Sequence, residues 1–94
     1  HQALPLEMRR RYLFRAEDAV NQSTASLAKI DSLLKREMEN LRGMEECTAA
    51  IPPRYQSQCR ELIGECCRLN LAIKPIIGNI QTAADETVSK LQLA

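Results

Sequence analysis

The chain has 94 residues, of which 45% are apolar and 27% are charged, a composition typical of one small globular or coiled-coil domain. Its formal net charge of +1 provides no overall attraction to nucleic acid or to an anionic membrane. No apolar run approaches the roughly 18 residues of a membrane span, and no signal peptide is evident. We therefore expect one helical interaction domain over residues 1–94, with no membrane partner.

Two long helices are predicted, because the chain is strongly interrupted only at Pro52 and Pro53. Pro53 is unsuited to a helix interior but suits a first turn, and Pro5 has the same role near the N-terminus. We expect a helix from about residue 5 to 47, a turn over 48–52 and a second helix from about 53 to 91. The apolar pattern continues through Pro75, which predicts a kink there rather than a helix end.

Apolar residues recur with heptad spacing in both predicted helices, as in a coiled coil. In the first helix the row comprises Leu6, Leu13, Val20, Leu27, Leu34 and Leu41. In the second helix it comprises Tyr55, Cys59, Leu62, Cys66, Leu69, Ile73, Ile76, Ile80, Ala83 and Thr87. Folded back so that opposed residue numbers sum to 96, the two rows meet along their length and the turn centres on Thr48. The predicted fold class is all-α, an antiparallel helical hairpin of two long helices.

A three-helix bundle is the alternative fold. The stretch from Asn21 to Ser26 contains weak helix formers, so the first helix would break there. Pro75 would then lie at the junction of two further helices. The hairpin is favoured because its two heptad rows pair along their whole length.

The second helix carries more apolar surface than one interhelical contact requires. A second row beside the first includes Leu71, Ala84 and Leu91, and Gly64 and Gly78 lie near it. A chain this short buries a limited fraction of its surface, so self-association into a bundle or docking of a partner's helix is expected. The glycines could also simply tolerate a bend around Pro75. The predicted partner-binding residues are Ile63, Gly64, Cys67, Leu71, Ile77, Gly78 and Val88.

The four cysteines are interpreted as reduced, small, buried apolar side chains: Cys47, Cys59, Cys66 and Cys67. Cys59 and Cys66 lie about 10 Å apart along one helix, whereas bridged Cα atoms lie within about 7 Å. This favours an intracellular location, in cytoplasm or nucleus. A secreted, disulfide-stapled helical protein is the alternative. No metal site is expected, because there is no C-x-x-C motif and the only histidine is the terminal His1.

A basic cluster lies near the N-terminus, with Tyr12 and Phe14 interleaved: Arg9, Arg10, Arg11 and Arg15. It indicates either a nuclear or nucleic-acid-associated regulatory module or simply a solvated helix end.

Catalytic chemistry is not expected. General acid–base catalysis needs titrating groups gathered in a pocket, and here the carboxylates lie mostly away from the predicted interhelical contact. Glu37 is the acid predicted within that contact, where it marks a water-facing layer or pairs with a cation of a partner. The residues therefore predict a non-enzymatic interaction or oligomerisation module without a cofactor, acting as a scaffold or assembly subunit.

Overall fold

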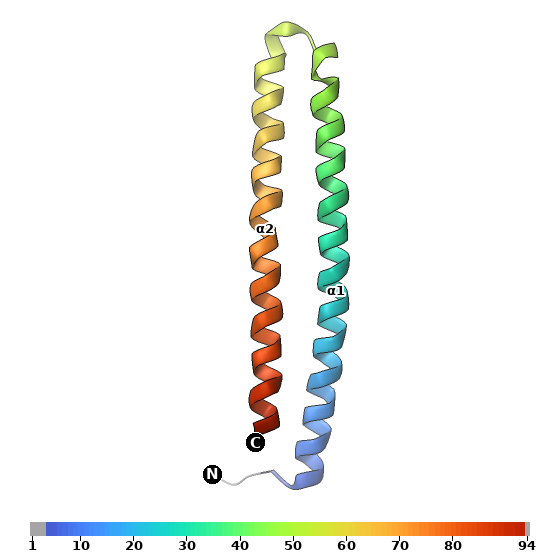
Figure 1. Ribbon diagram of the computed structural model, residues 1–94, viewed down its shortest axis with the longest axis vertical. Helices are drawn as coiled ribbons and strands as arrows, with labels where there is room; N and C mark the ends of the chain where they lie inside the picture. Colours follow the sequence, from blue (N-terminus) through green and yellow to red (C-terminus); the bar gives the residue numbers. More distant parts are fainter. Residues whose placement is uncertain (1–3, 94) are drawn as a thin grey trace.

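The computed structural model describes residues 4–93, which form two long α-helices joined by a short 3-10 helix. Helix α1 spans Leu6–Glu46, η1 spans Cys47–Ala50 and α2 spans Pro53–Leu93. The helices run antiparallel, side by side, in a particle of 71 × 21 × 13 Å (Figure 1). The predicted all-α helical hairpin is therefore confirmed.

Helix α1 is continuous through the stretch that the three-helix alternative would break. Its first turn follows Pro5, whose carbonyl accepts a hydrogen bond of 3.0 Å from the backbone N–H of Arg9. Within this stretch Ser23 is half-buried, and Leu27, which directly follows the stretch, is buried in the hairpin. Tertiary packing supplies most of the stability of helices in proteins, so it overrides the weak local propensity here. The three-helix bundle is therefore wrong.

Helix α2 likewise continues through Pro75, and its ribbon is uninterrupted at that level (Figure 1). Proline removes one backbone donor from a helix interior and crowds the preceding turn. Helix α2 nevertheless extends from Pro53 to Leu93 with Pro75 in its interior, so the helix does not end there.

The turn between the helices is held by side chains as well as by the backbone. Thr48 is only 2% exposed, and its hydroxyl donates to the Glu45 carbonyl at 2.6 Å. The Gln56 side-chain amide donates to the Ile51 carbonyl at 2.9 Å. These bonds satisfy carbonyls at the end of α1 and in the connection, as a buried turn requires.

The pairing of the helices differs from the predicted register. Asn70 Nδ2 donates to the Leu34 carbonyl at 3.2 Å, and Thr24 Oγ1 donates to Gln81 Oε1 at 3.1 Å. Opposed residue numbers therefore sum to about 104, not 96. The prediction centred the turn on Thr48, but η1 occupies Cys47–Ala50 and the chain reverses beyond it. The register prediction is wrong for this reason.

The new register turns a different row of α2 toward α1. We call the residues that lie between the helices the seam. On α1 the half-buried or buried members of the seam include Leu13, Ala16, Val20, Ser23, Leu27, Leu34, Met38 and Leu41, which keep most of the predicted heptad row. Glu37, which was predicted within the contact, is exposed and Met38 takes its place, so that prediction is wrong. On α2 it comprises Gln56, Cys59, Ile63, Cys67, Asn70, Ile77, Gln81, Ala84 and Val88. Most of the row predicted to face α1 is exposed instead.

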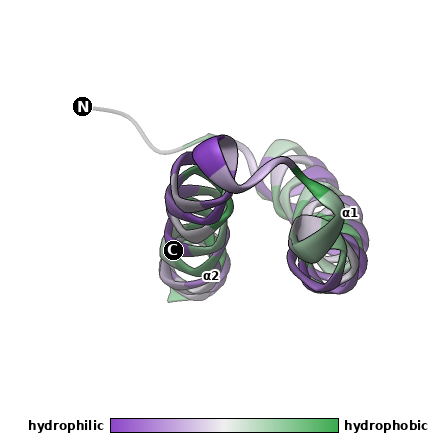
Figure 2. Cartoon of the chain, turned by 90° about the horizontal axis from the view of Figure 1, so that it is seen from above, coloured by the Kyte–Doolittle hydropathy of each residue, from purple (hydrophilic) through white to green (hydrophobic). Residues whose placement is uncertain are grey.

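The hairpin buries little of its apolar surface. Among the described residues, Leu27 and Leu41 are the buried apolar side chains, at 9% and 4% exposure. The accessible surface is 7739 Å², whereas a compact protein of 10.6 kDa exposes about 5,500 Å². The radius of gyration is 21.6 Å, against about 12 Å for a compact chain of this length. Viewed end-on, no other described element covers either side of the helix pair (Figure 2).

Candidate interaction surface

The predicted partner-binding residues divide into two groups. Ile63, Cys67, Ile77 and Val88 are half-buried in the seam. Their interpretation as an uncovered row is wrong, because the observed register turns them toward α1. Gly64, Leu71 and Gly78 are exposed on one side of the seam, each one position after a seam residue. Any role of these three in binding stays a prediction.

The residue numbers show on which side of the hairpin each side chain lies. Each residue of an α-helix turns by about 100°, so the residue just before a seam position lies on one side and the residue just after it on the other. An antiparallel pair has approximate two-fold symmetry about a line perpendicular to the plane of both helices. Residues that precede seam positions therefore lie on the same side of the hairpin in both helices.

The side formed by the preceding residues is apolar. Leu62, Leu69 and Ile76 precede the seam residues Ile63, Asn70 and Ile77, and all three are exposed. On α1, Leu33 precedes Leu34 in the same way. We call this side the apolar face and define it by Leu62, Cys66, Leu69, Ile73, Ile76 and Ile80 of α2 with Ile30 and Leu33 of α1.

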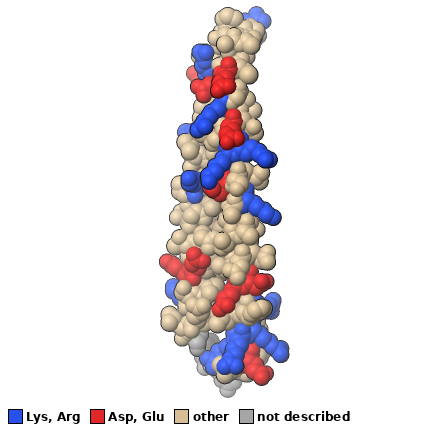
Figure 3. Space-filling view, turned by 45° about the vertical axis from the view of Figure 1, so that its right-hand side comes forward, with Lys and Arg blue, Asp and Glu red and all other residues tan. Residues whose placement is uncertain are grey.

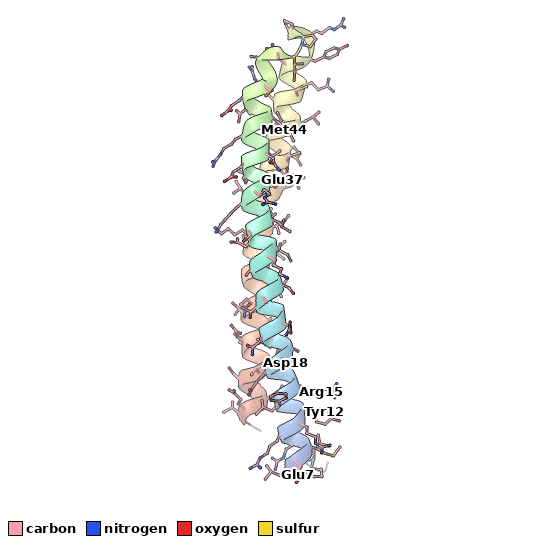
Figure 4. The ribbon with its side chains drawn as sticks, turned by 90° about the vertical axis from the view of Figure 1, so that its right-hand side faces the viewer. Glu7, Tyr12, Arg15, Asp18, Glu37 and Met44 are labelled. Atoms are coloured by element: carbon pink, nitrogen blue, oxygen red, sulfur yellow. The ribbon has the colours of Figure 1, made fainter. Side chains whose placement is uncertain are left out.

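Charge is nearly absent from this face. The α2 row has no charged residue between Leu62 and Ala83. On α1, Glu37 is exposed at the edge of the face, one position before Met38, and it lies along the half of α1 nearer the turn (Figure 4). Tyr12 and Arg15 lie near the other end of the same helix (Figure 4). An exposed row of large apolar residues on this scale is typical of an interaction surface.

The opposite side, which we call the polar face, is formed by residues that follow seam positions. Its side chains bond to one another within the chain. Besides the Thr24–Gln81 bond, Gln81 Nε2 donates to Asp85 Oδ1 at 3.0 Å, and Lys35 Nζ lies 3.1 Å from Asp31 Oδ2 beside this face. These polar groups hydrogen-bond within the chain and can also contact water, so this side of the hairpin is stable when exposed to solvent.

Helix α2 also carries an ion pair on its outer surface. Arg68 donates hydrogen bonds to the carboxylate of Glu65, one turn earlier. These hydrogen bonds hold the pKa of Glu65 below its ordinary value and raise the pKa of Arg68. Both groups are exposed, so the pair adds little to stability.

The four cysteines have free thiols in two environments. Cys59 and Cys67 are half-buried in the seam, in keeping with their interpretation as small apolar side chains. Cys47 and Cys66 are exposed, so the expectation of burial is wrong for these two. No cluster of possible metal ligands is present among residues 4–93, and His1 lies outside the described residues.

The basic cluster lies in the first turns of α1, where Lys and Arg gather toward one end of the molecule (Figure 3). Arg9, Arg10, Arg11 and Arg15 are all exposed. Because successive residues turn by about 100°, the three consecutive arginines point to three different sides of the helix. Arg15 follows Arg11 by one turn and lies on the same side, so the cluster is spread around the helix rather than gathered into one stripe.

Neither helix of the described chain has a stretch apolar enough to cross a membrane. No family model, curated protein or solved structure matches the chain. The surface itself is therefore the basis for a functional assignment.

Proposed function

We propose that this chain is a non-enzymatic assembly module that associates with protein through its apolar face. The observation that carries the proposal is the exposed, uncharged row of leucine and isoleucine side chains along α2. Leu62 is 59% exposed and Leu69 is 50% exposed, although a heptad row of this kind normally packs against another helix.

The energetic gain from covering this face is large for so small a chain. Complete burial of one Leu or Ile side chain contributes about 1.5–3 kcal/mol. The five large aliphatic side chains of the α2 row are each roughly half exposed. Covering all of them would add on the order of 5 kcal/mol per chain, which is comparable to the whole stability of a small domain.

A matched pair of substitutions tests the proposal. Leu62 lies on the apolar face and Leu71 on the polar side of α2, and their exposures are 59% and 60%. Leu62→Glu and Leu71→Glu therefore introduce the same charge on the same helix at equal exposure. Light scattering coupled to size-exclusion chromatography should show an assembled wild type, whether with itself or with a bound protein.

We expect Leu62→Glu to reduce the assembled mass to that of the 10.6 kDa chain and Leu71→Glu to leave it unchanged. Circular dichroism should show similar helix content for both variants, since neither residue is buried. Loss of assembly with Leu71→Glu alone would instead support the surface around Gly64, Leu71 and Gly78. A wild-type monomer at high concentration with nothing bound would contradict the proposal.

An intracellular location is part of the proposal, because a reducing compartment maintains free thiols of the kind seen here. A thiol titration of protein purified without reductant should give four free thiols per chain. A count of zero would favour the secreted, disulfide-stapled alternative.

A further inference from the structure

The residues of the exposed row of α2 are spaced symmetrically, so the intervals are the same when counted from either end. Its members are Leu62, Cys66, Leu69, Ile73, Ile76 and Ile80, in steps of four, three, four, three and four. The midpoint lies between Leu69 and Ile73, at residue 71. A second α2 helix laid antiparallel about this point would pair every member of the row with another member.

The pairs also match in size. Leu69 would oppose Ile73 of the second copy, Leu62 would oppose Ile80, and the small Cys66 would oppose Ile76. Shifting the register by one heptad in one direction sets Leu62 opposite Thr87. The shift in the other direction sets Ile80 opposite Tyr55. Only the register centred on residue 71 pairs all six residues of the row with one another. Such pairing favours close packing of an apolar layer.

Helix α1 supports the same centre independently. The bond from Asn70 to the Leu34 carbonyl brings residues 33 and 34 of α1 level with residues 70 and 71 of α2. A two-fold axis at this level passes Leu33, which lies on the apolar face and is 60% exposed. Leu33 would then pack against Leu33 of the second copy. About the same axis, Glu37 lies opposite Lys29 of the second copy, so the one acid of the face gains a cation.

The elongated hairpin leaves more surface exposed than a standard dimer interface covers. Each chain exposes about 2,200 Å² more than a compact protein of its mass, whereas a standard interface covers about 800 Å² per partner. The apolar row of α2 lies about 100° from its seam, close to the right angle between the two neighbours of a helix in a four-helix bundle.

We infer that the apolar face binds a second copy of this chain, forming a two-fold symmetric four-helix bundle in which the two α2 helices run antiparallel about residue 71. This inference rests on the proposed function and names its partner. The interface is isologous, because the same residues contribute from both copies.

Cross-linking tests the orientation. In a chain whose four cysteines are replaced by alanine or serine, Glu65→Cys and Asn79→Cys place thiols on exposed positions that flank the row on the same edge. Their midpoint is residue 72, one residue from the proposed centre, so the antiparallel dimer brings them within about 3 Å of level across the interface. Mild oxidation of a mixture should form the mixed disulfide at least tenfold faster than either self-disulfide, because like positions are offset by roughly 20 Å along the helix.

A charge swap at Leu33 tests the axis in the native chain and needs no cysteine replacement. Leu33→Glu and Leu33→Lys should each raise the dimer Kd more than tenfold, because like charges meet at the axis. Mixing the two variants should restore a dimer by light scattering. The matched mixture of Leu71→Glu and Leu71→Lys should dimerise before and after mixing, since Leu71 lies on the other side of α2.

The outcomes separate this inference from the proposed function. Faster self-disulfides, or no recovery on mixing the Leu33 variants, would overturn the antiparallel two-fold dimer. A chain that binds a different protein through a Leu62-dependent contact would also overturn it, but would retain the proposed function. A monomer with no partner at high concentration would overturn both.

Discussion

The apolar and polar faces lie on opposite sides of one seam, yet they relate differently to the rest of the chain. On the polar face, Thr24 and Asp85 bond to the seam residue Gln81, so their polar groups have partners within the chain. On the apolar face, Leu62, Leu69 and Ile76 have no third element of the described chain above them. The polar face carries polar side chains that bond within the hairpin, whereas the apolar face carries a row of large apolar side chains that stays exposed.

This difference shows why two helices alone make an incomplete protein. A helix at the corner of a bundle needs two apolar rows, one for each neighbour, and α2 carries both of them. The hairpin covers the row that contains Ile63 and Ile77 and leaves its neighbour exposed. The first two predictions ask whether the seam and the apolar face are energetically separable, and the last two probe the seam's polar position and the polar face.

The largest effect is expected at the seam, on which both faces depend. Leu41 is 4% exposed, so Leu41→Ala should destabilise the hairpin by about 2–5 kcal/mol through lost burial and a residual cavity. Chemical denaturation followed by circular dichroism measures this loss. Leu33→Ala is the control, because Leu33 is exposed on the apolar face and its truncation should affect association more than helix content. Equal loss of helix in both variants would show that seam and face are not separable.

The apolar face should make stability depend on protein concentration. If assembly is coupled to folding, each tenfold increase in concentration should stabilise a dimer by about 1.4 kcal/mol, and Tm should rise accordingly. Ile76→Glu should abolish this dependence, whereas Leu71→Glu should preserve it. A Tm series over a hundredfold range of concentration, read by circular dichroism, makes the comparison. A wild-type Tm that does not depend on concentration would contradict self-association through this face.

A smaller effect is expected at Asn70, the buried polar residue of the seam. Its side chain bonds to a carbonyl that also belongs to a helical ladder, so an apolar replacement forfeits little bonding. Asn70→Leu should raise the free energy of unfolding by about 1 kcal/mol but relax the helix register, as buried asparagine sets register in coiled coils at a cost in stability. Thermal melts measure the first effect and the number of amide NMR resonances the second. A destabilised variant would show that the Asn70–Leu34 bond outweighs the buried apolar alternative.

The smallest effect is expected on the polar face, at its glycines. A Cβ atom added at Gly64 or Gly78 would meet no atom within 4 Å. Gly64→Ala and Gly78→Ala should each stabilise α2 by about 0.4–1 kcal/mol, because alanine has the higher helix propensity. The assembled mass should not change. If either variant stabilises the helix but weakens assembly, a partner approaches closely at that glycine and the division into two faces fails.

The sequence alone was enough to predict the helices and the hairpin. Helix limits follow from Pro5 and Pro53, which act locally on the backbone, and the observed bounds lie within about two residues of the predicted ones. The central row of the α1 seam, Val20, Leu27, Leu34 and Leu41, was also predicted correctly, because α1 has no second apolar row of the same length beside it.

Only the tertiary structure decided which row of α2 faces α1. The row of Leu62, Leu69 and Ile76 and the row of Ile63, Asn70 and Ile77 have the same spacing and differ by one residue, so periodicity does not distinguish them. The 3-10 turn at Cys47–Ala50, with buried Thr48 bonded to the end of α1, sets where α2 begins and how it is rotated. One residue of shift turns a helix by about 100°, which exchanges the covered row for the exposed one.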